Sequence, residues 1–409
     1  MIAIALRPMA TRPPAILALK SPGAYNSLDG VLSLITREWD RAGIRIIWVD
    51  LSFPDWEKRL LAEIEANQIR LCIATGFGGR FRFEDEYLWE HFRIPFVTIL
   101  HDHPGYFGMQ HRDLPRGVVL AYVYRDHALY QRDHVKSANL VITIDLGVPV
   151  TPAQLSPDAG RGSTAQVIFA KTGNDPLELE AKWAARPAIA GIIHDILDEV
   201  GLQNCSVFPA AIGKVASAHR LELQPFDKIS RFLIVQVDDY IRRRKSTLIV
   251  EAIKKFPVDI YGGHWDHISR HGAQARFRGA VQYSVLEYEI ARSIASITMN
   301  PNVDLAVHDR FYTALGAGVM PITDSNTFTK TNFPTLAPYT FNFFGRSVEA
   351  ALERVFTRPR EATEIARAAR NAAVGSLSTQ HAANDILRCA ELIDFFEFSF
   401  EPPQNYFIS

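Results

Sequence analysis

The sequence predicts an α/β chain folded as two domains, each built around a parallel sheet. Short apolar runs alternate with stretches that carry apolar residues at helical spacing, in two series separated by a mostly helical region. The chain has 409 residues, more than one hydrophobic core normally organises. Two such sheets leave a cleft between them, and ligands of open parallel sheets bind beyond the carboxyl ends of the strands.

The first series occupies the amino-terminal part of the chain. An apolar run at residues 15–20 predicts a strand, and residues 28–42 predict a helix that Gly43 ends. The pattern continues with expected strands at 44–51, 69–76, 95–101, 118–124, 140–145 and 166–170, and expected helices at 55–68, 84–92 and within 126–136. We therefore assign residues 1–175 to an amino-terminal domain.

The alternation stops there and resumes later. Residues 176–228 are expected to be mostly helical and to join the domains. A second domain over residues 229–358 is predicted from expected strands at 231–237, 258–261, 295–300 and 319–323 and expected helices at 246–255, 285–293, 310–315 and 347–356. The Ala-rich remainder, residues 359–409, is expected to form a helical segment that packs across both domains.

Composition excludes several classes of protein. Lys and Arg number 44 against 45 Asp and Glu, so the sustained positive field of a nonspecific nucleic-acid binder is absent and no nucleic-acid partner is expected. The three cysteines form no CxxC pair, which argues against a disulfide framework or a zinc cluster and favours a reducing compartment. No signal peptide and no transmembrane segment are expected. We expect a cytoplasmic protein and leave peripheral membrane contact open.

The densest group of polar residues lies between residues 277 and 324. Asn300, His308 and Arg310 fall between an expected strand and the helix that follows it. Free backbone N–H groups and the helix dipole favour an anion at such a junction, and a diphosphate is the obvious ligand. A capped helix with a solvated charge is the ordinary alternative.

Two more junctions of the same expected sheet add to this signal. The run 242–245 is basic, and Arg243 or Arg244 would neutralise phosphate if one or two of these side chains point inward; a solvated basic patch is as good an interpretation of each. We place the nucleobase and ribose at the loop 261–265 and the segment 277–283, where an aromatic ring covers the base; a simple turn is the alternative interpretation of the two glycines in this loop. The full set of expected donor-binding residues is Tyr240, Arg243, Arg244, Gly262, Gly263, His264, Val281, Tyr283, Asn300, His308, Arg310, Phe311 and Thr313.

At these residues the sequence resembles the group 1 glycosyltransferase superfamily, and within it the branch that includes the spore maturation protein CgeB. The resemblance covers roughly residues 231–387 and follows the segments FLIVQVDDYIRRRKSTLI, VDIYGGHW, FRGAVQYSVLEYEIARSIASITMNPN, HDRFYTALGAGVMPITD and SLSTQHAANDIL. In the amino-terminal half, ILHDHPG is similar to the acidic-proline segment that follows a central strand in this family.

The resemblance implies a GT-B fold, in which two Rossmann-like domains face an interdomain cleft. It implies a hexosyltransferase-type enzyme whose second domain holds a UDP- or GDP-sugar and whose first domain holds an acceptor glycan, protein or small molecule. It also implies no catalytic metal and no tightly bound cofactor. One position departs from the family: a Glu usually stands three residues after the Arg of the HDRF segment, where this chain has Thr313.

Glycosyl transfer builds negative charge on the departing diphosphate, so cations and helix N-termini must stabilise it when no metal does. We assign this role to Arg310 and to Arg243 or Arg244. An inverting reaction also needs a base from the first domain, for which Asp102 and His103 are the candidates. A turn in which Asp102 caps the backbone is an equally good interpretation, and a retaining reaction needs no such base.

Other functions compete with this one. A GT-B epimerase or phosphorylase would use the same cleft for different chemistry. A noncatalytic nucleotide-sugar or glycan-binding protein is favoured by the uncharged Thr313. A dehydrogenase is disfavoured, because no expected strand is followed by a well-formed G-x-G-x-x-G.

Overall fold

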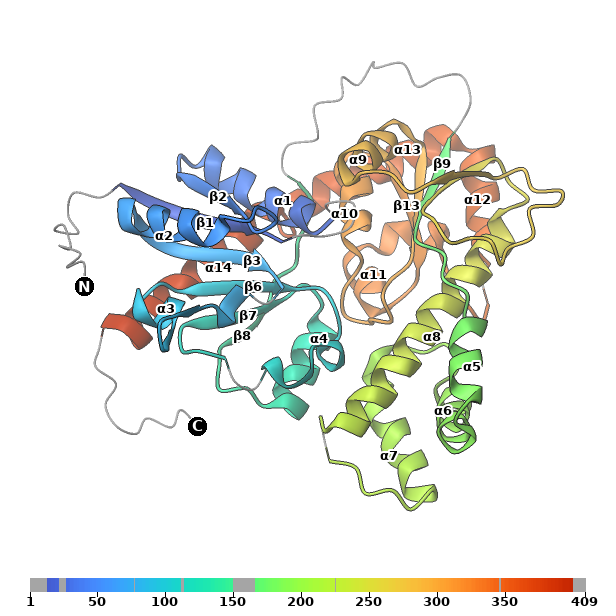
Figure 1. Cartoon of the computed structure of the whole chain (residues 1–409). Coiled ribbons are helices and arrows are strands. Elements are labelled where there is room, and N and C mark those ends of the chain that lie inside the picture. The colour runs from blue at the N-terminus through green and yellow to red at the C-terminus, as the bar shows by residue number, and fades with distance from the viewer. Residues whose placement is uncertain are drawn as a thin grey trace.

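The computed structural model describes residues 13–21, 27–76, 78–111, 114–149, 166–224, 226–345 and 347–399. These residues form two six-stranded parallel sheets that lie side by side (Figure 1). One cluster of buried apolar residues extends from the first sheet through helices of both domains to the second sheet, and each domain also has a smaller cluster of its own. The architecture confirms the expected GT-B class, with two parallel α/β domains.

The first sheet has the strand order β2-β1-β3-β6-β7-β8. Its strands are β1 (Pro14–Lys20), β2 (Ile46–Asp50), β3 (Gln68–Thr75), β6 (Phe96–Leu100), β7 (Val118–Tyr122) and β8 (Val141–Thr143). Its helices are α1 (Ser27–Arg41), α2 (Trp56–Ala66), α3 (Leu88–His91) and α4 (Arg125–Tyr130), with the short turns η3 (Gly78–Arg80), η4 (Pro104–His111) and η5 (Gln131–Val135). The expected helix 84–92 is shorter than predicted, because β4 (Arg82–Phe83) and β5 (Glu86–Tyr87) form an antiparallel pair just before α3.

The second sheet has the order β11-β10-β9-β12-β13-β14. Its strands are β9 (Val167–Ala170), β10 (Val258–Tyr261), β11 (Arg276–Gly279), β12 (Ala295–Thr298), β13 (Met320–Asp324) and β14 (Thr340–Phe341). Its helices are α9 (Tyr283–Arg292), α10 (Asp309–Gly316), α11 (Thr327–Asn332), α12 (Val348–Thr357) and α13 (Pro359–Val374), with the turn η7 (Pro334–Tyr339).

The strand β9 belongs to the second sheet, although the sequence analysis placed residues 166–170 with the first domain. All four of its residues are buried, and it pairs in parallel with β10 on one side and β12 on the other. A short apolar run predicts a strand but carries no information about which sheet supplies its neighbours. The chain therefore enters the second sheet at its centre.

The expected strand 231–237 is wrong, because these residues lie inside the helix α8 (Lys228–Ile253). The Asp227 carboxylate accepts a hydrogen bond from the Ser230 backbone N–H at 2.6 Å and caps the helix start. Leu233, Val237 and Ile241 are buried at intervals of four residues, which is helical spacing. The apolar run before Asp238 is compatible with either a strand or a buried helix. It forms a helix because it is part of the much longer helix α8.

The remaining helices connect the two domains. The segment between β9 and α8 contains α5 (Leu177–Ala184), α6 (Pro187–Val200), η6 (Cys205–Val207) and α7 (Phe208–Ala218), and Figure 1 shows α6 and α7 beside the amino-terminal half of α8. The final segment is two helices, α13 and α14 (Thr379–Ile393), followed by the turn η8 (Asp394–Ser399). The α14 helix returns to the first domain, where the Trp39 indole of α1 donates a hydrogen bond to the Ala383 carbonyl at 3.1 Å.

Candidate functional site

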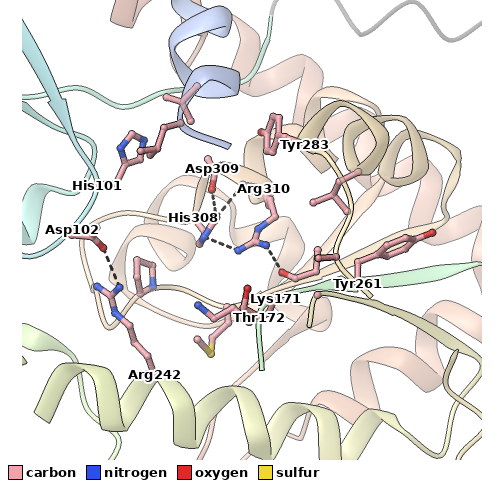
Figure 2. A pocket seen from close by; sticks show the side chains of 18 of the residues that line it. His101, Asp102, Lys171, Thr172, Arg242, Tyr261, Tyr283, His308, Asp309 and Arg310 are labelled. Carbon is pink, nitrogen blue, oxygen red and sulfur yellow. Dashed lines mark hydrogen bonds and ion pairs between the residues drawn. The ribbon is translucent and has the colours of Figure 1, made fainter. Parts of the chain in front are cut away.

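A cavity of about 340 Å³ opens between the two sheets. The first domain lines it with residues from α1 and from the loops after β6 and β7, and the second domain with the loops after β9, β10, β11 and β12. Figure 2 shows polar side chains from both domains converging on this space. Its size suits a small ligand.

The topology of the second sheet explains the position of the cavity. From β9 the chain builds the sheet outward to β10 and β11, and then returns to β12 on the other side of β9. The strand order reverses between β9 and β12, and the crevice at such a switch point is the usual ligand site of an open α/β sheet. Lys171 follows β9 directly, and the loop after β12 leads to His308 and Arg310.

Arg310 lies at the start of α10 and is held by two hydrogen bonds. Its Nη1 donates to the Ala170 carbonyl, and its Nη2 lies 2.8 Å from His308 Nε2. Because a guanidinium can only donate, His308 Nε2 must accept this bond, while Nδ1 lies beside the Asp309 carboxylate and the Arg310 backbone N–H. Burial and the nearby Arg310 charge lower the pKa of His308 to about 4, so this ring is neutral at pH 7.

Asp309 is the ionised partner of this group. Burial raises the pKa of its carboxyl, but the contacts with His308 and Arg310 outweigh burial and lower the pKa below its usual range. The three consecutive residues therefore carry one cation, one anion and one neutral ring at pH 7.

Lys171 and Arg242 bring two further cations to the cavity. Burial, together with the charges of Arg310 and Arg242, lowers the pKa of the Lys171 ammonium to about 8. Arg242 reaches the cavity from α8, and its Nη1 lies 3.4 Å from an Asp102 carboxylate oxygen in the first domain. Three cations that line one cavity favour a ligand with more than one negative charge.

The wall formed by the first domain carries His101, Asp102 and Tyr124. Burial lowers the pKa of His101, while the Asp309 and Asp102 charges act in the opposite direction. Within the described part of the chain, the His101 Nε2 atom has no hydrogen-bond partner. A neutral imidazole of this kind can accept a proton.

Six of the residues expected from the sequence line the cavity. They are Asp102, Gly262, Val281, Tyr283, His308 and Arg310. Gly262 has a φ of 129° and would bring any Cβ into the Lys171 backbone carbonyl, so this position requires glycine. The expectation that the strand ends of the second domain meet at one site thus agrees with the geometry.

The other expected residues lie elsewhere. His103 is fully buried and its Nδ1 accepts a hydrogen bond from the Gly105 N–H at 3.1 Å, so it turns into the first domain and away from the cavity. Asn300 is also fully buried and accepts the His308 N–H at 3.0 Å, which makes it a support for the loop. Phe311 packs in the core, 5.0 Å from the Phe333 ring. Thr313 lies behind Tyr283, with 3.5 Å between their hydroxyl oxygens.

The residues expected on α8 and on the glycine loop also miss the cavity. Tyr240 donates to the Glu180 carboxylate at 2.6 Å, and Arg243 pairs with Asp239 at 2.9 Å, both on the side of α8 that faces α5. Arg244 is exposed. Gly263 accepts the Gly173 N–H at 2.9 Å, and His264 is exposed with a φ of 63°. The helical periodicity of α8, had it been recognised, would have separated Arg242 from Arg243.

The sequence analysis missed Lys171 and His101. Lys171 was hidden because β9 was placed in the first domain, far from the phosphate site expected in the second. His101 was passed over in favour of its neighbours Asp102 and His103. Alternation along an extended segment would put residues 101 and 103 on the same side, but only if the strand continued past β6. The chain instead turns into η4 at Pro104.

Known proteins support the fold and the class of the second domain. Residues 242–388, about a third of the chain, match the family model described as "Glycosyl transferase-like", which supports the expected group 1 glycosyltransferase superfamily. Among solved structures, the chain is similar to AviGT4, a glycosyltransferase involved in avilamycin A biosynthesis, with a TM-score of 0.50, 11% identity, and 93% of this chain and 98% of that chain covered. This similarity shows the fold.

Sucrose-phosphate synthase from Thermosynechococcus elongatus gives a TM-score of 0.48 at 12% identity, covering 93% of this chain and 99% of that chain. No curated protein matches the sequence.

The described residues contain no group of three or more His, Cys, Asp or Glu side chains placed to hold a metal ion. None of the helices they form is both long enough and apolar enough to cross a membrane.

Proposed function

We propose that the chain is a glycosyltransferase that moves a sugar from a nucleotide diphosphate donor to an acceptor bound by the first domain. The observation that carries this proposal is the convergence of Lys171, Arg242 and Arg310 at the switch point of the second sheet, opposite His101 and Asp102 of the first. A diphosphate satisfies three cations better than any single carboxylate does. The glycosyl transferase-like match over residues 242–388 supports the same class.

The three cations have a defined role in this reaction. As the bond between the anomeric carbon and the diphosphate breaks, charge builds on the leaving oxygen, and donors fixed in advance stabilise it. Arg310 is fixed by Ala170 and His308, and Arg242 by its partners on α8 and in the first domain. Lys171 adds a third positive charge. The three cations together supply the charge stabilisation that a metal ion supplies in other transferases.

The finer assignments belong to the same proposal. The donor is a UDP- or GDP-hexose, its base lies against Gly262, Val281 and Tyr283, and the chain acts without a metal in the cytoplasm as a member of the CgeB-like branch. An inverting reaction would take its base from Asp102 or from His101. The acceptor is a glycan, a protein or a small molecule.

Arg310→Ala tests the proposal directly. Removing a donor from the leaving group costs about a hundredfold in transfer rate, and we expect a clear loss of affinity for UDP, GDP or dTDP in calorimetry with the purified chain. Arg244→Ala is the matched control, because Arg244 is exposed and does not line the cavity. Wild-type affinity for every nucleoside diphosphate equal to that of Arg310→Ala would contradict the assignment.

A noncatalytic binding protein is the second candidate, because the position where the resembled family carries Glu is Thr313, whose hydroxyl is 3.5 Å from the Tyr283 hydroxyl. Donor binding without turnover across an acceptor library would favour it. Product analysis without added acceptor distinguishes transfer from epimerisation.

A further inference from the structure

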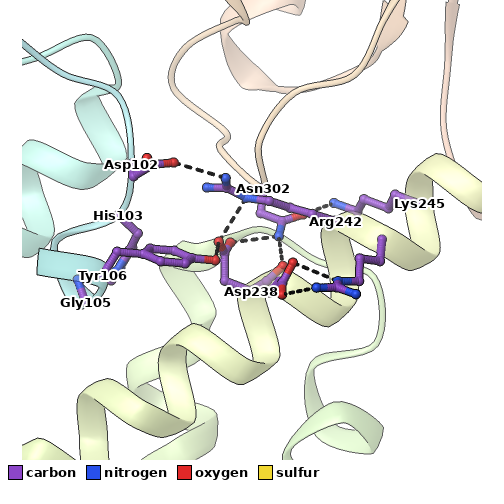
Figure 3. A network of polar contacts seen from close by, with 10 residues as sticks. Asp102, His103, Gly105, Tyr106, Asp238, Arg242, Lys245 and Asn302 are labelled. Carbon is purple, nitrogen blue, oxygen red and sulfur yellow. Dashed lines mark hydrogen bonds and ion pairs between the residues drawn. The ribbon is translucent and has the colours of Figure 1, made fainter. Parts of the chain in front are cut away.

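A buried carboxylate on α8 contacts the arginine of the cleft. Asp238 is fully buried, and its Oδ2 lies 2.9 Å from Arg242 Nε. The same oxygen accepts a hydrogen bond from the Tyr106 hydroxyl at 2.8 Å. Its Oδ1 accepts one from the Asn302 side-chain amide at 2.9 Å (Figure 3). One carboxylate therefore binds three partners.

These partners come from three parts of the molecule. Tyr106 lies in η4, just after Asp102, which pairs with the other end of the Arg242 guanidinium. Asn302 lies in the loop between β12 and α10, next to Pro301 of the cavity wall. Arg242 lies one helical turn after Asp238 on α8. Asp238 thus joins a loop of each domain to a cavity cation.

The orientation of Asn302 is fixed independently. Its Oδ1 accepts a hydrogen bond from the buried Lys245 ammonium at 2.9 Å. Because an ammonium only donates, the amide oxygen must face Lys245 and the NH₂ must face Asp238. Asn302 is fully buried, with a backbone φ of 54°. A buried, fully bonded side chain of this kind holds its partner in one place.

The neighbouring pair on the same helix provides a comparison. Asp239 and Arg243 have the same four-residue spacing and lie 2.9 Å apart, as Asp238 and Arg242 do. Arg243 also pairs with Glu178 at 3.3 Å, at the start of α5, and does not line the cavity. Only the Asp238 pair is bonded to loops of both domains.

We propose that Asp238 is a positioning residue that orients Arg242 toward the donor diphosphate. Because Asp238 also bonds to Tyr106 and Asn302, the orientation of Arg242 depends on the docking of the two domains. The inference rests on the proposed function, in which Arg242 binds the diphosphate. Arg242 is fully restrained only when the loop after β6 and the loop after β12 both contact α8.

Asp238→Asn separates this positioning role from a simple charge effect, because the two predict opposite changes in the affinity for a nucleoside diphosphate. If Asp238 were only a counter-charge, its neutralisation would raise the positive potential of the cavity and strengthen binding of a nucleoside diphosphate. If it positions Arg242, the affinity for UDP falls by about tenfold, the usual loss when a charge-assisted hydrogen bond between an arginine and a phosphate is weakened, while uridine binds as before. Calorimetry with UDP and uridine, or with GDP and guanosine if that base is preferred, measures both. Unchanged or tighter diphosphate binding overturns the proposal.

Two controls use the same helix. Asp239→Asn makes the same chemical change beside Arg243 and is expected to leave the affinities for UDP and uridine unchanged. In an Arg242→Ala background, Asp238→Asn is expected to add no further loss, because its effect passes through Arg242. A fully additive loss would show that Asp238 acts by another route, and this too overturns the proposal.

A ligand-free measurement keeps the inference separate from the proposed function. Crystal structures of the wild-type chain and of Asp238→Asn are expected to show the Arg242 guanidinium withdrawn from Asp102 in the variant only. If the wild type binds no nucleoside diphosphate, the proposed function fails, while this comparison still decides the positioning role. An unmoved Arg242 decides against it.

Tyr106→Phe is a milder change if Asp238→Asn does not fold. It removes one hydrogen bond from Asp238, and we expect a loss of about two- to threefold in UDP affinity with none for uridine. An equal loss for both ligands indicates general destabilisation and contradicts the proposal.

Discussion

Lys171 occupies the first position after β9, and its environment makes its charge sensitive to pH. Burial and the neighbouring Arg310 and Arg242 charges lower the pKa of its ammonium to about 8. A bound diphosphate would favour the protonated form. In the ligand-free protein Lys171 is therefore expected to lose its charge in mildly alkaline solution, and the affinity that the proposed function assigns to it should fall as it does.

The prediction concerns nucleoside diphosphate affinity between pH 7 and pH 9.5. Above about pH 8 Lys171 loses its proton, so the affinity of the wild type is expected to fall by up to about tenfold per pH unit. The terminal phosphate, with a second pKa of about 6, is mostly ionised at pH 7 and becomes more so above it, so it does not cause a fall in affinity. Calorimetry at several pH values measures the slope.

Two variants decide whether Lys171 is responsible for this slope. Lys171→Arg keeps its charge across the range and should abolish the fall in affinity, while Lys171→Met should bind weakly at every pH. A slope that persists in Lys171→Met would show that another group titrates.

At the scale of elements, the helix α1 of the first domain touches the start of α9 in the second. Gly30 of α1 faces the Tyr283 ring, and a Cβ at this position would overlap that ring. Tyr283 also lines the cavity. The absence of a side chain at Gly30 thus permits the close approach of two helices beside the site.

Gly30→Ala is expected to push the Tyr283 ring out of position. Nucleoside diphosphate binding should weaken several-fold, which corresponds to about 1 kcal/mol of overpacking. Gly213→Ala is the matched control, since a Cβ on this α7 glycine meets nothing within 4 Å. The control should raise thermal stability slightly through helix propensity and leave binding unchanged. Equal binding by Gly30→Ala and the wild type would show that this contact does not shape the site.

Sequence patterns were sufficient to place some strands and helices but not others. The junction of β12 and α10 was located correctly because the strand and the helix follow each other along the chain, with one loop at residues 299–308 between them. The assignment of β9 and the helical nature of residues 231–237 required information from distant partners. Strand β9 is defined by β10 and β12, which lie far along the chain, and no local property of Val167–Ala170 reveals them.

At the scale of the whole molecule, the first domain buries three histidines that play no part in the proposed reaction. His103, His111 and His127 are fully buried, with His103 and His127 rings 5.3 Å apart. Burial lowers the pKa of His103 and of His111 to about 3 and also lowers that of His127. These rings stay neutral in the folded state well below the pH at which free histidine is protonated.

The free energy of unfolding is therefore expected to fall with acid. Above about pH 6.5 the three rings are neutral in both states, so they contribute no pH dependence. Below that value only the unfolded chain binds protons, which costs about 1.4 kcal/mol per pH unit for each histidine down to its folded pKa. Urea unfolding at pH 7.5, 6 and 5 measures this slope.

His127→Phe is expected to reduce the pH dependence of the unfolding free energy by the contribution of one histidine, because phenylalanine does not titrate. Its ring is similar in shape to the imidazole that it replaces. His271→Gln, a change at an exposed position, should leave this pH dependence unchanged. A slope that His127→Phe does not alter would show that other groups dominate the acid transition.

The sequence by itself determined the alternation of strands and helices, the presence of two parallel sheets, and the position of the strand–loop–helix junction that contains His308 and Arg310. These features depend on residues close together in the chain, so local patterns reveal them. Only the tertiary structure decided that β9 lies at the centre of the second sheet and that Arg242, rather than Arg243, faces the cleft. Sheet membership and the buried face of a helix depend on long-range packing, which brings Lys171, Arg242 and Arg310 together from three distant segments.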